Sequence, residues 1–452
     1  MRSAGATATV AGMSASVPQR ERRGNPPAAG PGRNASRWLV LAAYTALILL
    51  RVPEIVWPGR FWGEEGTIYF REAFLNSPPQ VLFTSNLGYY SLFNKLAALT
   101  TAHAVPLEFA PVVTMLFAFV IQLSPAILLL FCRIPALPTL AHRAVAVALV
   151  LFIQPNQEVW LNTINSQSFL CVATGIVLIS SPTGRPAHIL RLGLLALAGL
   201  TGIVSALLLP LFLWDWWRER DRHRAQETSV LFLAGIVQAA VVMTGDGRDV
   251  QPVWSLMPLA LAGKQWVLPL FGYEAFDVFI DFLRPRPLLT RFPMILWMLF
   301  PYALCIAVAI RQRNRTAGML LAAALGVASI SLMASLPAQD INTFGYSCIT
   351  GSADGRYYYA PNVLLGLSLL SMLGSFRSQS GGLDRGFRWA AALLILLLLA
   401  TGLANHRHPG TWSHGPSWRA EVRVWREGRT GTLALWPPPW RLDLRPNPPD
   451  LE

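Results

Sequence analysis

Apolar runs long enough to cross a lipid bilayer recur through most of this sequence, and short clusters of arginine separate them. A hydrocarbon core about 30 Å thick takes a helix of about 20 residues, and every backbone polar group within it needs a partner. Such runs restrict the chain to helices packed against one another. The composition agrees: 53% of the residues are hydrophobic and only 13% are charged, whereas soluble domains carry about 25% charged residues.

The apolar runs and the arginine clusters together predict a topology. Basic residues are enriched in the cytoplasmic loops of membrane proteins, so the clusters are placed inside and the chain crosses about eleven times. Residues 189–217 carry arginines at both ends, and we expect two half-length helices there that turn near residues 199–202, where glycine permits a tight reversal. The other expected crossings are residues 38–56, 107–131, 144–154, 168–180, 230–243, 292–310, 317–336, 361–374 and 389–403.

This topology divides the chain into three parts. Residues 1–36 have no apolar face, which predicts a disordered cytoplasmic arm. Residues 37–404 are expected to form an all-α, multi-pass transmembrane domain in a bacterial inner membrane. Residues 405–452 would form a small extracytoplasmic tail, either a strand-rich cap or an ordered strap. The net charge of +13 does not indicate a nucleic-acid partner, because the arginines lie between apolar runs.

The polar and aromatic loops all fall on the outer face in this topology. Within the first of them, residues 79–104 mix aromatic and polar side chains, which predicts an amphipathic helix along the membrane interface. A functional site is therefore expected on the outer side. The loops are residues 58–106, 155–167, 245–291 and 337–359.

Two adjacent carboxylates, Glu64 and Glu65, follow the first apolar run within the sequence Trp-Gly-Glu-Glu-Gly. Charges close to the hydrocarbon are costly and by default indicate a functional site. Two neighbouring carboxylates repel each other, which raises the pKa of one of them and suits a general base or acid. The alternative is structural: an acidic pair stabilises the N-terminal turn of a helix.

A second candidate is Arg356, which Tyr357 and two further tyrosines follow at the entrance to an expected crossing. A guanidinium there can hold a lipid-linked phosphate through two parallel, charge-assisted hydrogen bonds. The alternative is an arginine that snorkels within an aromatic belt at the membrane boundary.

A third candidate is an outer loop dense in amides, with Asn162, Asn165 and Gln167. Amides hydrogen-bond sugar hydroxyls, and Trp160 in the same loop offers a face on which a sugar ring can stack. Ordinary loop chemistry would produce a similar composition. Lys264 interrupts an apolar run and is a weaker candidate for a phosphate contact.

These motifs resemble those of the GT-C superfamily of membrane glycosyltransferases, which includes protein O-mannosyltransferases. The resemblance comprises the acidic motif in the first outer loop, the interfacial segment after it, a Leu-Ala-Gly-Leu-Thr-Gly turn, and the late Arg356-Tyr357 pair. The chain also resembles uncharacterised bacterial membrane proteins with an Asn-x-x-Asn-x-Gln loop and a Trp-Arg-x-Glu tail. It departs from the superfamily in having glutamate where aspartate is most often the first-loop acid.

The resemblance implies that the donor is a sugar on a polyprenyl phosphate and that transfer inverts the anomeric centre. Glu64 or Glu65 would accept the proton of the acceptor hydroxyl, while Arg356, with Lys264, would offset charge on the departing phosphate. The acceptor is a glycan, a lipid or a protein, and membrane lipids surround the chain. No cofactor is expected because phosphate already leaves readily, with a divalent cation on the acidic pair as the alternative.

Two other functions are compatible with the same motifs. A transporter or flippase of lipid-linked sugars would also use an arginine, aromatic residues and an outward cleft, but it predicts more charges deep within the crossings. A polysaccharide polymerase or ligase shares the substrates but predicts a large outer loop rich in arginine, whereas residues 245–291 hold only a few.

Overall fold

The computed structural model describes residues 31–57, 59–244, 257–283, 288–335, 355–375, 382–407 and 413–445. Nearly all regular structure in these ranges is helical, and two strands of two residues each lie in the tail. Three helices are both long and apolar enough to cross a membrane by length and composition. The expectation of an all-helical protein with apolar spans is therefore confirmed. The three are Leu107–Phe131, Arg222–Thr244 and Gly382–Ala404.

The chain enters the bundle through helix α1 (Pro31–Arg51), whose first residues lie within the segment expected to be disordered. Residues 1–30 lie outside the described ranges. Helix α2 (Pro53–Val56) follows at once. Helix α1 ends before Pro53 because proline cannot donate the next backbone hydrogen bond and disfavours a helical residue before it.

The first loop is built from four short helices and differs from the expected single interfacial helix. They are η1 (Glu65–Phe70), α3 (Arg71–Leu75), α4 (Pro78–Phe83) and α5 (Leu92–Ala104). A turn separates α4 from α5, where Leu87 and Gly88 have φ angles of 59° and 77°, and a helix cannot continue through this left-handed region. Helix α5 also buries Lys95 and its neighbours instead of lying on the surface.

The half of the bundle that follows contains the expected break in residues 189–217. Helix α9 (Arg185–Gly199) and helix α10 (Leu209–Glu219) are separate, with a turn and the short helix η3 (Ala206–Leu208) between them. In this turn, the Leu200 N–H donates to the Ala196 carbonyl. The Leu200 carbonyl accepts from the N–H of Leu92, the first residue of α5. The other elements here are η2 (Leu107–Phe109), α6 (Ala110–Phe131), α7 (Leu140–Phe152), α8 (Ser166–Ile179) and α11 (Arg222–Thr244).

Residues 245–291 were expected to be an outer loop, and within them residues 257–283 are helical. They form helices α12 (Met257–Ala262), η4 (Gly263–Val267) and α13 (Leu268–Leu283). Their side chains are largely apolar and buried, and such a segment is stable as a helix once the bundle covers it. Helices α14 (Leu288–Arg311), α15 (Arg315–Ser335), α17 (Arg356–Ser375) and α18 (Gly382–Ala404) complete the bundle.

Helices α8 and α17 form the centre of the bundle, since nearly every residue of α8 and of the middle of α17 is buried. Both helices are accordingly apolar around most of their circumference, with a few buried polar residues. Their N-terminal ends lie together, because Ser168 Oγ donates to the Arg356 carbonyl at 3.4 Å. The expected outer loop at residues 337–359 ends where α17 begins, and its earlier part up to residue 354 lies outside the described ranges.

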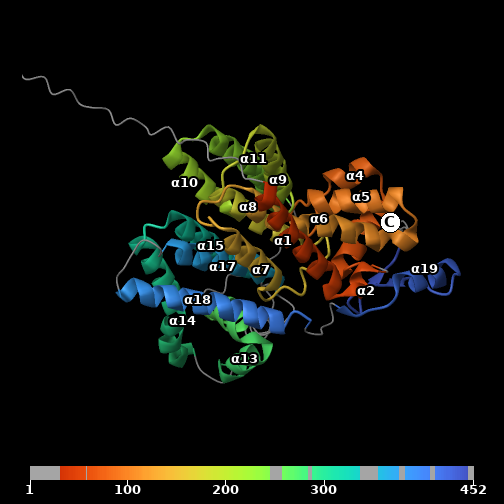
Figure 1. Ribbon diagram of the computed structural model, residues 1–452. Coiled ribbons are helices and arrows are strands. Elements are labelled where there is room, and N and C mark those ends of the chain that lie inside the picture. Colours follow the sequence, from red (N-terminus) through yellow and green to blue (C-terminus); the bar gives the residue numbers. More distant parts are fainter. Residues whose placement is uncertain are drawn as a thin grey trace, which may run out of the picture.

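The tail docks on the first loop. It contains helix α19 (Trp418–Arg426) and the antiparallel strands β1 (Leu433–Ala434) and β2 (Arg441–Leu442), with Leu433 opposite Leu442. The tail is therefore a mixed unit and not the strand-rich cap considered from the sequence. In Figure 1, α19 lies at the same end of the molecule as α2, α4 and α5, away from α10 and α14.

Candidate active site

An ion pair between Glu64 and Arg356 lies where the first loop meets the centre of the bundle. Glu64 Oε2 is 3.1 Å from Arg356 Nη1, and the two side chains are 17% and 24% exposed. Glu64 stands at the N-terminal cap of η1, and Arg356 is the first residue of α17. The structure thus brings together two of the residues singled out in the sequence, which are 292 positions apart.

Arg356 is held against the preference of its own helix. A cation at a helix N-terminus is opposed by the helix dipole, so the position requires compensating carboxylates. Glu64 supplies one, and Glu158 supplies another, with its Oε2 accepting from the Arg356 backbone N–H at 3.0 Å. The Arg356 guanidinium also lies 5.3 Å from the centre of the Tyr357 ring. The result is a partly accessible cation between two acids.

A group of buried polar side chains from the first loop adjoins this ion pair. The Tyr69 hydroxyl lies near Tyr89, Ser91 and Asn94, and Tyr89 lies close to both Glu64 and Arg356. Burial raises the pKa of Tyr69 to about 12 and that of Tyr89 well above its ordinary value. Both phenols are therefore protonated at neutral pH and able to donate.

Three of these polar atoms, the Tyr69 hydroxyl, Ser91 Oγ and Asn94 Oδ1, are buried and, within the described ranges, lack a hydrogen-bond partner at normal geometry. Buried polar atoms are usually satisfied, and each exception calls for an explanation. Their position beside a charged pair is suited to a polar ligand that also contacts Arg356.

Glu65 has a different environment from Glu64. Its side chain is buried, and Oε1 accepts from the backbone N–H and the hydroxyl of Thr163 at 2.9 and 2.6 Å. Oε2 accepts from the backbone N–H of Trp62 at 3.1 Å. Burial raises the pKa of Glu65, while these hydrogen bonds and nearby Arg60 act in the opposite direction. Glu65 therefore joins the first loop to the amide-rich loop, and Glu64 pairs with Arg356.

The amides predicted to bind sugar hydroxyls bind their own loop in this structure. Asn162 Nδ2 and Asn165 Nδ2 both donate to the Glu158 carbonyl, at 2.7 and 2.9 Å. Asn162 Oδ1 accepts from the Asn165 backbone N–H at 2.9 Å. These bonds close the loop and fix Glu158 beneath Arg356. Gln167 is half-buried and its side chain packs against Gly202.

Trp160 lies inside the protein and is only 1% exposed. The Arg51 guanidinium covers one face of its ring at 4.1 Å, and the His406 ring meets it edge-on with centroids 5.8 Å apart. The Trp160 carbonyl accepts from Arg60 Nη2 at 2.9 Å. The face proposed for sugar stacking is therefore occupied by a side chain of α1.

Lys264 is buried in η4. Its Nζ lies 4.8 Å from the centre of the Phe276 ring. Its carbonyl accepts from Asn362 Nδ2 at 2.8 Å, and the same amide donates to the Gln154 carbonyl at 2.8 Å. Asn362 thus links the backbone of Lys264 to Gln154, the residue before the amide-rich loop.

The tail braces the acidic loop. A Cβ atom on Gly63 would lie 2.5 Å from the Trp440 ring, so the indole rests directly on the residue before Glu64. The Trp436 backbone N–H donates to the Phe61 carbonyl at 3.2 Å, and Arg71 Nε donates to the Asp443 carbonyl at 2.9 Å. The sequence did not reveal this brace, nor the roles of Tyr69, Tyr89 and Glu158. For Glu158, the one feature of the sequence that pointed to a role was its position within the amide-rich loop.

In the described ranges, no three His, Cys, Asp or Glu side chains are grouped so that they could hold a metal ion. No protein-family model, curated protein or solved structure matches this chain. What the site can do is therefore argued from its own chemistry: a partly exposed carboxylate, a guanidinium paired with it, and protonated phenols beside both.

Proposed function

We propose that this protein is a membrane glycosyltransferase of the GT-C type that moves a sugar from a polyprenyl phosphate to an acceptor at the outer face of a bacterial inner membrane. The observation that carries the proposal is the contact between Glu64 and Arg356. A transfer of this kind needs a base that reaches the acceptor and a cation that faces the leaving group, and the two must share one cavity.

The ion pair suggests how the donor activates the base. A phosphate that binds Arg356 through two parallel hydrogen bonds competes with the Glu64 carboxylate for the same guanidinium. When the phosphate of the sugar donor replaces the Glu64 carboxylate at Arg356, Glu64 becomes free to accept a proton. The acceptor oxygen then attacks the anomeric carbon as its proton passes to Glu64. The bond from that carbon to the phosphate oxygen breaks, and the electron pair stays on the phosphate beside Arg356.

The surrounding residues have supporting roles in this proposal. Glu158 keeps Arg356 oriented after the Glu64–Arg356 ion pair breaks, because the Glu158 carboxylate accepts from the backbone N–H of Arg356. The protonated phenols of Tyr69 and Tyr89 supply further donors to the sugar or its phosphate. The full set of about eleven crossings, with the first loop and the tail on the outer side, belongs to the same proposal.

The test is release of sugar from a radiolabelled polyprenyl-phosphate donor by membranes that contain the full-length protein. We expect Glu64→Gln to lower transfer by about 10²- to 10⁴-fold, the usual effect of losing a general base. We expect Arg356→Lys to lower it by about 10²-fold, because lysine cannot form the paired hydrogen bonds.

Glu54→Gln provides the matched control, since Glu54 is an exposed acid of the neighbouring helix α2. Its transfer activity should equal that of the unaltered protein. Unchanged transfer by Glu64→Gln would refute the assignment of the base. Movement of the labelled lipid across the membrane without release of sugar would support the flippase instead.

A further inference from the structure

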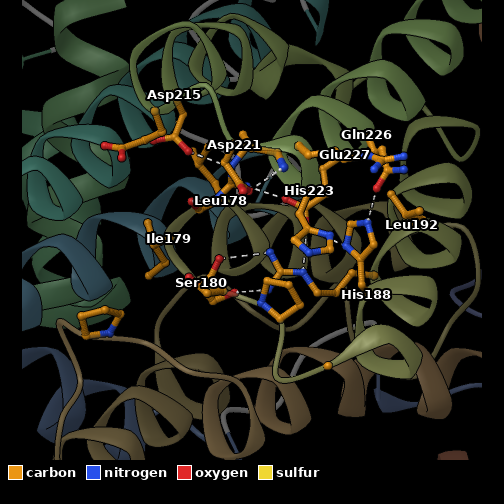
Figure 2. A pocket seen from close by; sticks show the side chains of 18 of the residues that line it. Leu178, Ile179, Ser180, His188, Leu192, Asp215, Asp221, His223, Gln226 and Glu227 are labelled. Carbon is orange, nitrogen blue, oxygen red and sulfur yellow. Dashed lines mark hydrogen bonds and ion pairs between the residues drawn. The ribbon is translucent and has the colours of Figure 1, made fainter. Parts of the chain in front are cut away.

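A cavity of about 1230 Å³ lies at the opposite end of the bundle from Glu64 and Arg356. It is lined by the C-terminal end of α8, the first turns of α9, α11 and α15, and the end of α10 (Figure 2). Helix α8 has 14 residues and begins beside Arg356, and a helix rises 1.5 Å per residue. About 20 Å therefore separate this cavity from the proposed active site.

One wall of the cavity is a chain of alternating charges. Glu227 pairs with Arg191 at 2.7 Å and with Arg224 at 2.8 Å. Arg224 also pairs with Asp215 at 2.7 Å, and Asp215 in turn pairs with Arg315. Arg315 pairs with Glu219 as well. Three arginines and three acids thus balance one another, and this wall contributes no net charge to a ligand.

The rim of the cavity is cationic. Arg185 and Arg222 line it, are exposed, and belong to no ion pair within the described ranges. His223 is also exposed, and its ring meets that of His188 edge-on with centroids 4.4 Å apart. The one acid that lines the cavity outside the alternating chain is Asp221, which caps α11 by accepting from the Arg224 backbone N–H at 3.0 Å.

His188 lies between the chain of alternating charges and the cationic rim. His188 is 5% exposed, and its Nδ1 makes no hydrogen bond within the described ranges. The nearest acid is Glu227, whose Oε1 is 3.8 Å away and already binds Arg191. The other ring nitrogen, Nε2, is bound to Gln226 at 2.8 Å, as Figure 2 shows. With Nε2–H donating to Gln226 Oε1, Nδ1 of the neutral ring is an acceptor that faces Glu227, so the groups that can hold an anion are the exposed cations of the rim, Arg185 and Arg222.

The apolar surface beside the cavity identifies the source of the anion. On α9, Ile189 lines the cavity and is 58% exposed, and Leu190 next to it is 75% exposed. On α10, Trp214 and Trp217 are 40% and 62% exposed, and Trp214 lies 5.0 Å from the Arg315 guanidinium in the cavity wall. Exposed tryptophan beside arginine is typical of the level of lipid headgroups. A soluble anion would gain nothing from this surface, whereas acyl chains would cover it.

We propose that this cavity binds the headgroup of an anionic phospholipid. Its phosphate is held by Arg185 and Arg222 beside the exposed His223, and its acyl chains lie against the apolar face of α9 and α10. Basic pockets between membrane helices are known to take such headgroups. The site is separate from the proposed transferase chemistry, and its test does not depend on that activity.

The experiment measures binding of fluorescent phosphatidylglycerol and phosphatidylcholine to the full-length protein in detergent. The test variant is Arg185→Gln with Arg222→Gln. The control is Arg429→Gln with Arg441→Gln, which removes the same charge from exposed positions in the tail. Thermal melting of each variant checks that the fold is retained, as expected for exposed side chains.

We expect the unaltered protein to prefer phosphatidylglycerol, and the test variant to bind it about tenfold more weakly, the effect of losing a charge-assisted hydrogen bond. The control variant should bind as the unaltered protein does. Equal binding of the two lipids, or unchanged binding by the test variant, would overturn the proposal. So would full displacement of the lipid by inorganic phosphate at equal concentration, because the site would then select a soluble anion.

Discussion

At the scale of single residues, Glu64 and Glu65 are neighbours in sequence whose carboxylates lie in different surroundings. Glu64 pairs with Arg356 and is partly exposed, whereas Glu65 is buried and accepts three hydrogen bonds. Two hydrogen-bond donors of Thr163 and one of Trp62 depend on Glu65 for a partner. The two interpretations of the acidic pair thus apply to different residues: Glu64 is the candidate base, and Glu65 has a structural role.

This difference predicts opposite phenotypes for the same substitution. Glu65→Gln replaces one carboxylate oxygen by an amide donor, which leaves a buried N–H of Trp62 or Thr163 without an acceptor. We expect a loss of about 1–3 kcal/mol in the free energy of unfolding. Glu64→Gln should leave the melting temperature in detergent nearly unchanged. If both variants melt alike, the hydrogen bonds to Glu65 do not stabilise the fold as described.

His406 predicts how stability depends on pH. Its ring is packed between Phe152 and Trp160, and burial together with Arg51 and Arg407 lowers its pKa to about 4. The unfolded chain binds this proton below about pH 6.5, and the folded chain does so only near pH 4. The unfolded state therefore binds more protons in this window, and stability falls as the pH is lowered through it.

His406→Phe should weaken that dependence. Neither ring nitrogen of His406 makes a hydrogen bond within the described ranges, so phenylalanine removes the titration without leaving a polar partner unsatisfied. Melting curves at pH 7 and pH 5 should show a smaller difference for the variant than for the unaltered protein. An equal difference in both proteins would assign the pH dependence to other groups.

The sequence indicated the chemistry of the site better than its geometry. Glu64 and Arg356 were recognisable because charges beside apolar runs are costly, but nothing in the sequence showed that they touch. Their contact joins the cap of η1 to the first residue of α17, which is 292 positions away in the sequence. The amide-rich loop was recognisable by composition, yet composition cannot distinguish amides that bind a ligand from Asn162 and Asn165, which bind their own backbone.

At the scale of helices, hydrophobicity located most elements of the bundle, because a long apolar run has no other stable form in a membrane. It failed where helices are short or interrupted. Residues 79–104 divide at a left-handed turn at Leu87 and Gly88, which the pattern of apolar residues does not encode. Residues 257–283 are helical although they were assigned to a loop between the crossings at residues 230–243 and 292–310.

The contact between α18 and α7 gives a prediction for packing. A Cβ atom on Gly402 would overlap the Phe152 carbonyl, which is backbone and cannot move aside. We expect Gly402→Ala to separate the two helices and to cost about 1–3 kcal/mol of stability. Gly386→Ala is the matched control on the same helix, since a Cβ there meets open space. The melting temperature should fall for Gly402→Ala and not for Gly386→Ala. Equal melting temperatures of the two variants would contradict the close contact.

At the scale of the whole molecule, the two ends of the bundle differ in chemistry. Arg191, Arg224 and Arg315 gather at one end around the cavity of Figure 2. The first loop, the amide-rich loop and the tail gather at the other, around Glu64 and Arg356. The distribution of arginine along the sequence predicted such a separation, and in a membrane the arginine-rich end is the one expected to face the cytoplasm.

This orientation predicts the result of chemical labelling in intact cells. In a variant without native cysteines, Thr430→Cys in the tail should react with a membrane-impermeant maleimide, because Thr430 is exposed. Ser181→Cys, exposed at the other end beside the cavity of Figure 2, should react only after the membrane is permeabilised. Equal labelling of both positions before permeabilisation would rule out the proposed orientation.

The docking of the tail on the first loop has a consequence for biosynthesis. The ribosome makes the segment around Gly63 early and the segment around Trp440 some hundreds of residues later. Until Trp440 emerges and settles on Gly63, the loop that carries Glu64 lacks its support. A premature stop codon shortly before Trp440 should therefore give a chain that inserts into the membrane normally and yet has no functional centre.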